Sequence, residues 1–410
     1  MIEILPFSGF RYNDKIPLEK VICLPYDVIS QEERTKFLNS HPYNFVHLTL
    51  GEKVPTDYKE IAKILDEWIK EKILIKEEDS AFYVYKQKFW WYGRKEVTWG
   101  LLALIKLQPL GEEDVLPHEQ TFYGPKKDRL EILRHCNANF EPIWGIYEDK
   151  EGFMSKLWQD LEKEKTLINA KSWDEREHIL WKVPSLWEER IKQFFKKKKI
   201  LIADGHHRYE ASWSYYQEKK DDRFGYIFIL LTDLYDPGIK VLPTHRILRN
   251  NLNISLVDLE DYFEINEEDF QEGKLDLVFS PSNPFIYYYT KKKLYKLFPK
   301  LAYLSSNHEK SNIWWVLPTT LLQKGVWEGI LNIKEGELQE KSLIRFSHSI
   351  KEVQELVSSN EFSSAFLLPA IPLETIYTLA IKGERLPQKS TYFYPKPISG
   401  LIFWKIDYEK

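Results

Sequence analysis

The apolar residues of this 410-residue chain fall into short unbroken runs and helical repeats that alternate along its length. Residues 200–203 and 226–232 are two such runs, which are typical of buried strands. Between them Tyr209, Trp213 and Tyr216 recur four and three positions apart, which predicts one face of a helix. Strand and helix signals in succession predict a mixed α/β fold.

Other segments carry equally local signals. The β-rich runs 81–91 and 97–107 flank a polar turn and predict a hairpin. Ser30 and Glu33 form the capping-box pattern of a helix start. The remaining predicted helices cover residues 58–69, 154–161, 187–195, 258–270, 319–324 and 374–382. The remaining predicted strands cover residues 21–24, 167–170, 179–183, 285–290, 294–297 and 401–406.

We expect three segments: an α/β core over residues 1–250, a second α/β lobe over 251–345, and a C-terminal segment, 346–410, that returns to the core. The sequence contains no low-complexity linker, so we expect tightly joined lobes. The last segment carries Lys389, Ser390 and Thr391 followed by three aromatic residues between prolines. That composition differs from a fraying tail: Lys389 could neutralise a phosphate, and the hydroxyls of Ser390 and Thr391 could hold phosphate or metal. The alternative is a rigid, proline-rich closing segment whose lysines face water.

The stretch ADGHHRYEA offers the clearest chemistry. Asp204 and Gly205 form a turn after the apolar strand, and His206, His207 and Arg208 follow in the first turn of the helix. A helix start favours anions through its N–H groups and dipole, glycine allows close backbone approach, and arginine can hold phosphate bidentately. We interpret these residues as a phosphate-binding loop. The alternative is a helix start capped by Asp204 beside two surface histidines.

The strand, helix and strand over residues 200–232 predict a right-handed βαβ unit with parallel strands. Ligands gather at the carboxyl ends of such strands, so we expect Asp233 at the same sheet edge as Asp204. Thr244, His245 and Arg246 are a further candidate group for this edge, although a His-Arg pair on a strand is more often structural.

A second cationic helix start follows the polar loop 111–127, which contains His118 and Glu119. Lys126 and Arg129 lie on one face of its first turn, and we interpret them as a clamp for phosphate or a substrate carboxylate. His118 or Glu119 would then serve as base or metal ligand. The alternative is a solvated basic face with an ordinary loop histidine.

Asp27 lies in a tight loop before a helix. It is a candidate ligand for magnesium or for a substrate amine. A turn carboxylate that bonds its own backbone is an equally good interpretation.

ADGHHRYEA resembles the Gly-x-His/Arg-Arg loop of the ParB/sulfiredoxin-like superfamily, which holds nucleotide phosphates at a helix start. The resemblance implies a core of that fold and phosphate binding by Gly205, His206, His207 and Arg208. His206 stands where sulfiredoxins have their catalytic cysteine, which argues against sulfiredoxin chemistry. The chain also resembles domain-of-unknown-function family 1015 over nearly its whole length, through PYDVIS, HEQT, K-x-D-R, ADGHHRYEA and PQKSTYFYPKPISG. That family implies no activity.

Composition narrows the classes of function. A net charge of −4 argues against a general nucleic-acid-binding protein. The two cysteines, Cys23 and Cys136, are too few for a disulfide framework or a cysteine-based zinc site. We see no signal-peptide pattern and no apolar run of membrane-spanning length, so we expect a cytoplasmic protein without a membrane partner.

These features favour a nucleotide-dependent phosphotransferase that acts on a small hydroxylated metabolite, with free serine suggested by the superfamily resemblance. The expected cofactors are ATP or ADP, with CTP as an alternative, and Mg²⁺. Gly205 to Arg208 would bind the nucleotide phosphates. Lys126, Arg129 and Lys389 would neutralise the transferred group, and Ser390 and Thr391 are further candidates for binding phosphate or metal.

Several side chains compete for acid–base catalysis: Asp27, His118, Glu119, Asp204 and His206. Asp27 and Glu119 are also the candidate magnesium ligands. Two other functions stay open, a nucleotide-gated regulatory protein of the ParB-like type and a small-molecule phosphatase that uses His206 or His207. The oligomeric state is not determined by any pattern in the sequence.

Overall fold

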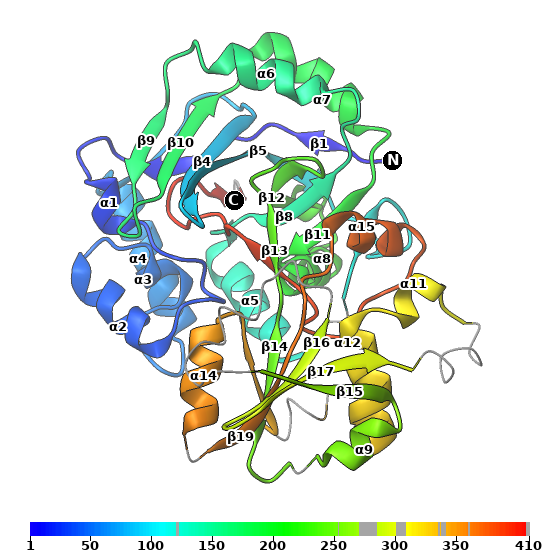
Figure 1. Cartoon of the computed structure of the whole chain (residues 1–410). Helices are drawn as coiled ribbons and strands as arrows, with labels where there is room; N and C mark the ends of the chain where they lie inside the picture. Colours follow the sequence, from blue (N-terminus) through cyan, green and yellow to red (C-terminus); the bar gives the residue numbers. More distant parts are fainter. Residues whose placement is uncertain are drawn as a thin grey trace. The chain divides into compact units, whose positions relative to one another are not determined.

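The computed structural model describes residues 1–119, 123–252, 254–269, 285–300, 309–334, 337, 342–359 and 361–406. The chain divides into two compact units. Unit 1 comprises Met1–Pro117, Thr121–Ile239 and Pro395–Lys410, and unit 2 comprises His118–Gln120 and Lys240–Tyr394. Helices and strands alternate in both units, which confirms the mixed α/β class (Figure 1).

A mixed sheet forms the centre of unit 1. Its strands lie in the order β6 (Val115–Pro117), β11 (Ile200–Asp204), β8 (Ile143–Tyr147), β12 (Tyr226–Asp233), β5 (Arg94–Lys106), β4 (Tyr83–Trp91), β10 (Glu177–Lys182) and β9 (Ile168–Lys171), with β1 (Ile4–Leu5) paired to β5. Helices α6 (Phe153–Leu161) and α7 (Glu188–Phe195) bury their apolar residues against this sheet (Figure 1). The predicted hairpin is confirmed as β4 and β5.

The predicted parallel βαβ unit is wrong. β8 lies between β11 and β12, antiparallel to the first and parallel to the second, so β11 and β12 run in opposite directions. Asp204 pairs with Trp144, near the start of β8, and Asp233 pairs with Tyr147, at its end. The two aspartates therefore lie toward opposite ends of the strands. An apolar run has the same pattern in either direction, so only the inserted strand β8 decides the polarity.

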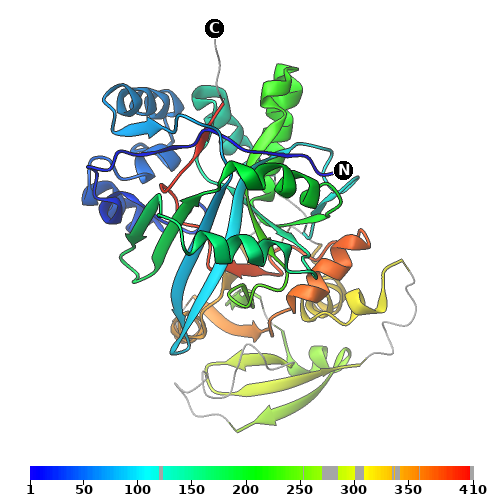
Figure 2. The same ribbon diagram turned by 90° about the horizontal axis from the view of Figure 1, so that it is seen from above.

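A second core of unit 1 lies among helices and the returning C-terminal residues. Phe45, Phe140 and Phe403 contact one another there, and Figure 2 shows the last strand beside the N-terminal segment. The elements are α1 (Leu18–Val21), α2 (Gln31–Ser40), α3 (Val46–Thr49), α4 (Tyr58–Lys70), α5 (Tyr123–Cys136), α8 (His206–Lys219), the pair β2 (Phe10–Tyr12) and β3 (Leu74–Lys76), and the pair β7 (Ala138–Asn139) and β21 (Trp404–Lys405).

Local signals in this region are partly confirmed. The capping box of Ser30 and Glu33 starts α2. The predicted strand 21–24 is wrong, because Val21 ends helix α1 and Cys23 makes only a single bridge, to Ser399. The apolar residues before Pro25 are compatible with a strand as well as with the end of a helix. The contact between Cys23 and the distant Ser399 leaves no signal in the neighbouring sequence.

Unit 2 contains its own antiparallel sheet, in the order β15 (Phe263–Glu268), β17 (Leu294–Pro299), β16 (Ile286–Thr290), β19 (Phe362–Leu367), β14 (His245–Arg249) and β18 (Ile344–Ser347). Helix α14 (Ile350–Ser358) packs on one face. The π-helix η4 (Leu322–Ile330) contacts Phe366 through Trp327, with ring centroids 5.6 Å apart. The other elements are α9 (Leu256–Glu260), α11 (Asn312–Trp315), α12 (Pro318–Leu321), α15 (Leu373–Ile381), and the pair β13 (Lys240–Leu242) and β20 (Tyr392–Tyr394).

The two units group the chain differently from the three segments expected from the sequence. Strand β14, inside the expected core, pairs with β18 and β19 from the expected C-terminal segment. The predicted helix 258–270 is also wrong, because α9 ends at Glu260 and β15 follows, paired along its whole length with β17; Phe270 lies outside the described residues. Among the described residues, no helix combines the length and apolarity needed to cross a membrane.

We expect the turn after β12 to make stability depend on pH. Asp236 accepts hydrogen bonds from the N–H groups of Trp99 at 2.8 Å and Gly238 at 2.7 Å. Burial nevertheless raises the pKa of Asp236 from 3.8 to about 6. Between pH 4 and 6 the folded state therefore keeps a proton on Asp236 that the unfolded state has lost. The stabilisation that this proton gives to the folded state decreases as pH rises through that window, and the free energy of unfolding decreases with it.

Replacement Asp236→Asn should abolish this contribution. Relative to wild type, the variant should gain about 2 kcal/mol in the free energy of unfolding as pH rises from 4 to 6.5. The hydrogen bond that the amide cannot accept lowers the stability of the variant by the same amount at every pH. Urea denaturation at several pH values measures the difference. Asp79→Asn, at an exposed carboxylate, controls for the change in charge. A difference that stays constant with pH would show that Asp236 is not the group responsible.

Candidate functional site

The loop between β11 and α8 has the backbone geometry of a close-approach turn. Gly205 has φ +93°, and a Cβ atom there would lie 2.7 Å from Ile143 Cγ2. The N–H of Tyr209 donates to the carbonyl of Gly205 at 3.0 Å, and this is the first hydrogen bond of α8. The amides of residues 206–208 come before this bond, so the helix itself offers them no acceptor. His206 is buried and His207 half-buried in this first turn.

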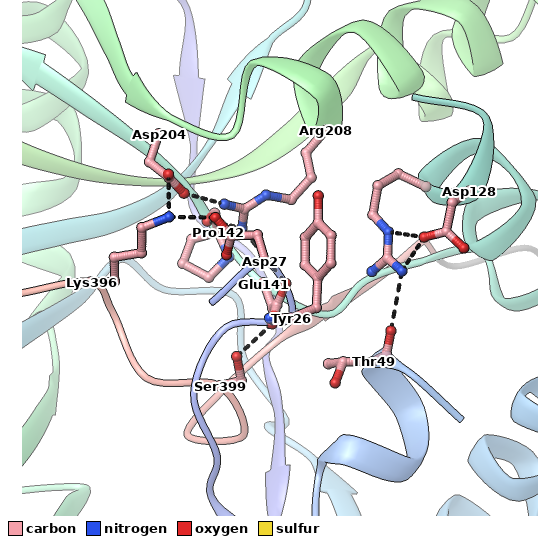
Figure 3. Close-up of polar contacts among 11 residues, drawn as sticks. Tyr26, Asp27, Thr49, Asp128, Glu141, Pro142, Asp204, Arg208, Lys396 and Ser399 are labelled. Carbon is pink, nitrogen blue, oxygen red and sulfur yellow. Dashed lines mark hydrogen bonds and ion pairs between the residues drawn. The ribbon is translucent and has the colours of Figure 1, made fainter. Parts of the chain in front are cut away.

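Two carboxylates of unit 1 share the ammonium group of Lys396. Its Nζ donates to Asp204 Oδ1 at 2.6 Å and to Asp27 Oδ2 (Figure 3). The side chain of Lys396 is 9% exposed, whereas those of Asp204 and Asp27 are 17% and 30% exposed. Three segments that are far apart in the sequence therefore meet at one cation. Asp27 is the member that solvent reaches most easily.

The guanidinium of Arg208 is held by the protein itself. Its Nη2 donates to Asp204 Oδ2 and its Nη1 to the carbonyl of Pro142, both at 2.6 Å. Glu141 Oε2 lies 3.9 Å from the same Nη1. Burial alone lowers the pKa of Arg208, but Asp204 and Glu141 outweigh it and raise the pKa above its ordinary value. Arg208 is thus charged and firmly positioned.

Tyr26 connects the two basic helix starts of unit 1. Its ring lies 3.8 Å from the guanidinium of Arg129 and 5.8 Å from that of Arg208. Burial raises the pKa of Tyr26 to about 12, although both arginines lower it. The predicted segments around Arg129 and Arg208 therefore converge, with an aromatic ring between them rather than a shared anion.

Lys126 and Arg129, which were predicted to clamp an anion together, have different environments in the structure. Arg129 Nε donates to Asp128 Oδ2 at 2.8 Å and Nη2 donates to the carbonyl of Thr49 at 3.2 Å. Lys126 is half-buried in the first turn of α5 and forms no ion pair with a described residue. Arg129 thus holds α5 to α3, and its role as a phosphate ligand stays a prediction.

Glu141 is a buried carboxylate behind this loop. It accepts hydrogen bonds from Ser399 Oγ at 2.6 Å and Tyr26 N at 3.0 Å. Burial raises its pKa, and Arg208 only partly offsets that effect. Beside it lies a cavity of about 30 Å³ lined by Arg129, Glu141, Arg208 and Ser212. That volume is enough for one water molecule and too small for a nucleotide or a metabolite.

The remaining predicted site residues belong to unit 2. His118 Nε2 and Thr391 Oγ1 are hydrogen-bonded at 2.8 Å, and Ser390 Oγ donates to the carbonyl of Pro387. Lys389 is exposed with φ +55°, and its carbonyl accepts from Arg246 Nη2 at 3.0 Å. Ser390 thus stabilises its own turn, and Thr391 joins that turn to His118. Gln120 and Thr121 of the HEQT motif lie outside the described residues.

The negative charge of Glu119 acts on the buried guanidinium of Arg246 in unit 2. Burial lowers the pKa of Arg246 to about 9, and the negative charge of Glu119 opposes the shift. Glu119 Oε2 is buried and has no hydrogen-bond partner among the described residues. Arg246 was expected to be structural, and its bonds to the 388–389 turn agree with that expectation.

Sequence reasoning missed Lys396, Tyr26, Ser399 and Glu141. The first three lie inside PYDVIS and PQKSTYFYPKPISG, the segments that carry the family resemblance. The prolines on both sides of Lys396 were the signal that could have identified it as a site residue. They restrict the backbone around a lysine that lies outside any helix or strand. Glu141 had no comparable signal, since a carboxylate before proline is common in loops.

Comparison with known proteins identifies a family. The model of the family described as "Protein of unknown function (DUF1015)" matches residues 4–320, which confirms the family resemblance of the sequence. A comparison with curated proteins finds no match.

Several solved structures are distantly similar. "Free serine kinase in complex with AMP" has 14% identity and a TM-score of 0.39, covering 72% of this chain and 88% of that chain. A conserved hypothetical protein from Pyrococcus furiosus has 14% identity and a TM-score of 0.38, covering 74% and 95%. SbnI with a C-terminal truncation, from Staphylococcus aureus, has 12% identity and a TM-score of 0.38, covering 73% and 85%. Similarity this low transfers neither a ligand nor an activity.

Gly205→Ala should destabilise unit 1 through both backbone and packing. Alanine is strained at φ +93°, and its Cβ would lie 2.7 Å from Ile143. We expect a loss of about 2 to 3 kcal/mol in the free energy of unfolding, measured with urea. Gly93→Ala is the matched control, because Gly93 has φ +75° with no atom within 4 Å, and should cost only about 1 kcal/mol. Equal losses in the two variants would contradict close packing at the loop.

Lys396→Gln should leave two neighbouring carboxylates without their cation. We expect a loss of about 3 kcal/mol in the free energy of unfolding. The double variant Lys396→Gln/Asp27→Asn should recover part of it, because one of the repelling charges is then removed. Lys182→Gln, in an exposed pair with Asp79, should change stability by less than about 0.5 kcal/mol. A similar small effect at Lys396 would disprove its central role.

Proposed function

Since this chain belongs to the DUF1015 family, whose description names no activity, we propose from its own residues that it is a nucleotide-dependent phosphotransferase acting on a small hydroxylated metabolite. One observation carries the proposal: Lys396 bonds both Asp27 and Asp204 beside the start of α8. Charged groups gathered in this way at a strand end and a helix start are typical of functional sites. The loop's resemblance to phosphate-binding loops of ParB/sulfiredoxin-like proteins supports the same function.

The nucleotide phosphates bind at the start of α8. The amides of residues 206–208 and the helix dipole favour an anion there. Lys396 and Arg208 add positive charge from fixed positions, because each is bonded to Asp204. His207 lies half-buried in the same turn. ATP or ADP is the expected donor, with CTP as the alternative.

Asp27 is the base in this proposal. With 30% of its side chain exposed, it is accessible to a substrate hydroxyl, of which free serine offers one example. The hydroxyl oxygen attacks the terminal phosphorus while its proton passes to Asp27. The bond from that phosphorus to the bridging oxygen breaks, and the shortened nucleotide leaves with the electron pair. Asp204 keeps Lys396 and Arg208 in place.

Magnesium fits this site as a companion of the nucleotide. Asp27 and Asp204 offer carboxylate oxygens, and Mg²⁺ in nucleotide sites takes one or two carboxylates plus phosphate and water oxygens. Within the described ranges, no group of three or more His, Cys, Asp and Glu side chains is arranged to hold a metal ion. When bound, Mg²⁺ would neutralise phosphate charge. Glu119 in unit 2 stays a predicted metal ligand, as His118 stays a predicted acid–base group.

Nucleotide binding and turnover should separate in Asp27→Asn. Calorimetry with ATP, ADP and CTP, each with and without Mg²⁺, should detect binding to wild type. The variant should bind the same nucleotide within about threefold, because the amide keeps the shape of the side chain. Phosphoryl transfer to serine and other small alcohols should fall by about 10²-fold or more, because the base is lost.

Asp79→Asn is the control and should leave both binding and transfer unchanged. Absence of binding by all three nucleotides would overturn the proposed function. Release of inorganic phosphate from a phosphorylated metabolite without nucleotide would instead establish the phosphatase alternative.

A further inference from the structure

Unit 2 contains a cleft that the proposed reaction does not use. Its volume is about 400 Å³, within the range of small-molecule sites. Three elements form its walls: α11 with the residues before it, the start of the π-helix η4, and the segment 383–387. The residues used below are Lys310, Trp314, Trp315, Gln323, Lys324 and Arg385.

Hydrogen bonds join two of these walls, α11 with the residues before it and the segment 383–387. Trp314 Nε1 donates to the carbonyl of Arg385 at 2.8 Å. Ser311 N and Oγ donate to the two carboxylate oxygens of Glu384 at 2.7 and 2.6 Å. The shape of the cleft is therefore set by specific bonds and not by loosely packed surface loops.

The third wall is an uncommon helix. α12 continues into the π-helix η4, and wide turns of this kind occur frequently at functional sites. Gln323 and Lys324 of its first turn line the cleft, and Lys324 Nζ is held by Glu328 at 2.7 Å. This cation is already neutralised, so the charge balance of the cleft depends on the other two.

Among the residues that line the cleft, cations outnumber acidic residues. Neither Lys310 nor the side chain of Arg385 forms an ion pair with any residue that the structure describes, and Glu309 is the one acidic residue of the lining. Trp315 is nine-tenths buried in the wall, and its Nε1 has no acceptor in the described part of the chain. The two cations suit an anionic oxygen, and the Trp315 ring lines the same cleft.

We propose that this cleft is a second ligand site, which binds a small organic anion with a flat apolar body. The carboxylate or phosphate of the ligand bonds Arg385 and Lys310, and its apolar part lies against the tryptophan edges. The site adjoins two motif segments along the chain, because Leu386 N donates to His118 O at 2.7 Å and Pro387 begins the PQKS turn. The HEQT and PQKS segments then serve as the scaffold of this site.

Calorimetry of the full chain tests the proposal with four probes. Phenyl phosphate and benzoate carry both charge and ring, inorganic phosphate carries charge alone, and phenol carries the ring alone. We expect both ring-bearing anions to bind at least about tenfold more tightly than phosphate or phenol. The double variant Lys310→Gln/Arg385→Gln should weaken this binding by about 10²-fold, and Trp315→Phe by about tenfold.

The matched control is Lys351→Gln/Lys382→Gln, which removes the same charge from exposed positions of unit 2 outside the cleft. An equal loss of affinity in this control would show nonspecific charge attraction and overturn the proposal. Unchanged affinity in the cleft variant, or no binding of either ring-bearing anion, would overturn it as well. If Lys310→Gln/Arg385→Gln fails to fold, Trp315→Phe still decides, with unchanged affinity counting against the site.

Discussion

The bond of one buried ammonium group to two carboxylates organises the centre of unit 1. Lys396 brings Asp27 from the N-terminal region and Asp204 from the end of β11 to the same point. Without that cation, two neighbouring negative charges with limited access to water would repel each other. The C-terminal residues from 395 onward therefore belong to unit 1 through charge as well as through the packing of Phe403.

Asp204, which bonds Lys396, also bonds Arg208 and so affects the role that this arginine can have. In the sequence this arginine is a phosphate ligand, and in the structure it bonds Asp204 and the carbonyl of Pro142. In the proposed function, a phosphate at this helix start would share Arg208 with Asp204. The network then keeps the cations charged and oriented before a ligand arrives.

The motif residues divide between the two units and have different environments in each. Asp27, Asp204, Arg208 and Arg129 form a charged network in unit 1, whereas the hydroxyls of Ser390 and Thr391 bond groups of unit 2. Lys389 remains exposed at a turn whose carbonyls Arg246 holds. The structure therefore brings the first set together through charge and places the second set in hydrogen bonds of its own unit, and the binding role of both sets stays a prediction.

Local patterns were sufficient for elements whose determinants are neighbours in the chain. The β4–β5 hairpin, the capping box of α2, and the turn at Gly205 follow from alternation, side-chain capping and a required positive φ. The ADGHHRYEA loop likewise identified Asp204 and Arg208 as charged groups beside a helix start. These features depend on interactions within a few residues, so the sequence by itself determined them.

Tertiary structure alone decided the features that depend on distant pairing. The insertion of β8 between β11 and β12 set their opposite directions and separated Asp233 from Asp204, because an apolar run carries no information on polarity. The role of Lys396 came from ion pairs spanning hundreds of residues, which leave no periodic trace in the sequence. Side-chain types could therefore be predicted as reactive, but their partners could be known only once the chain was folded.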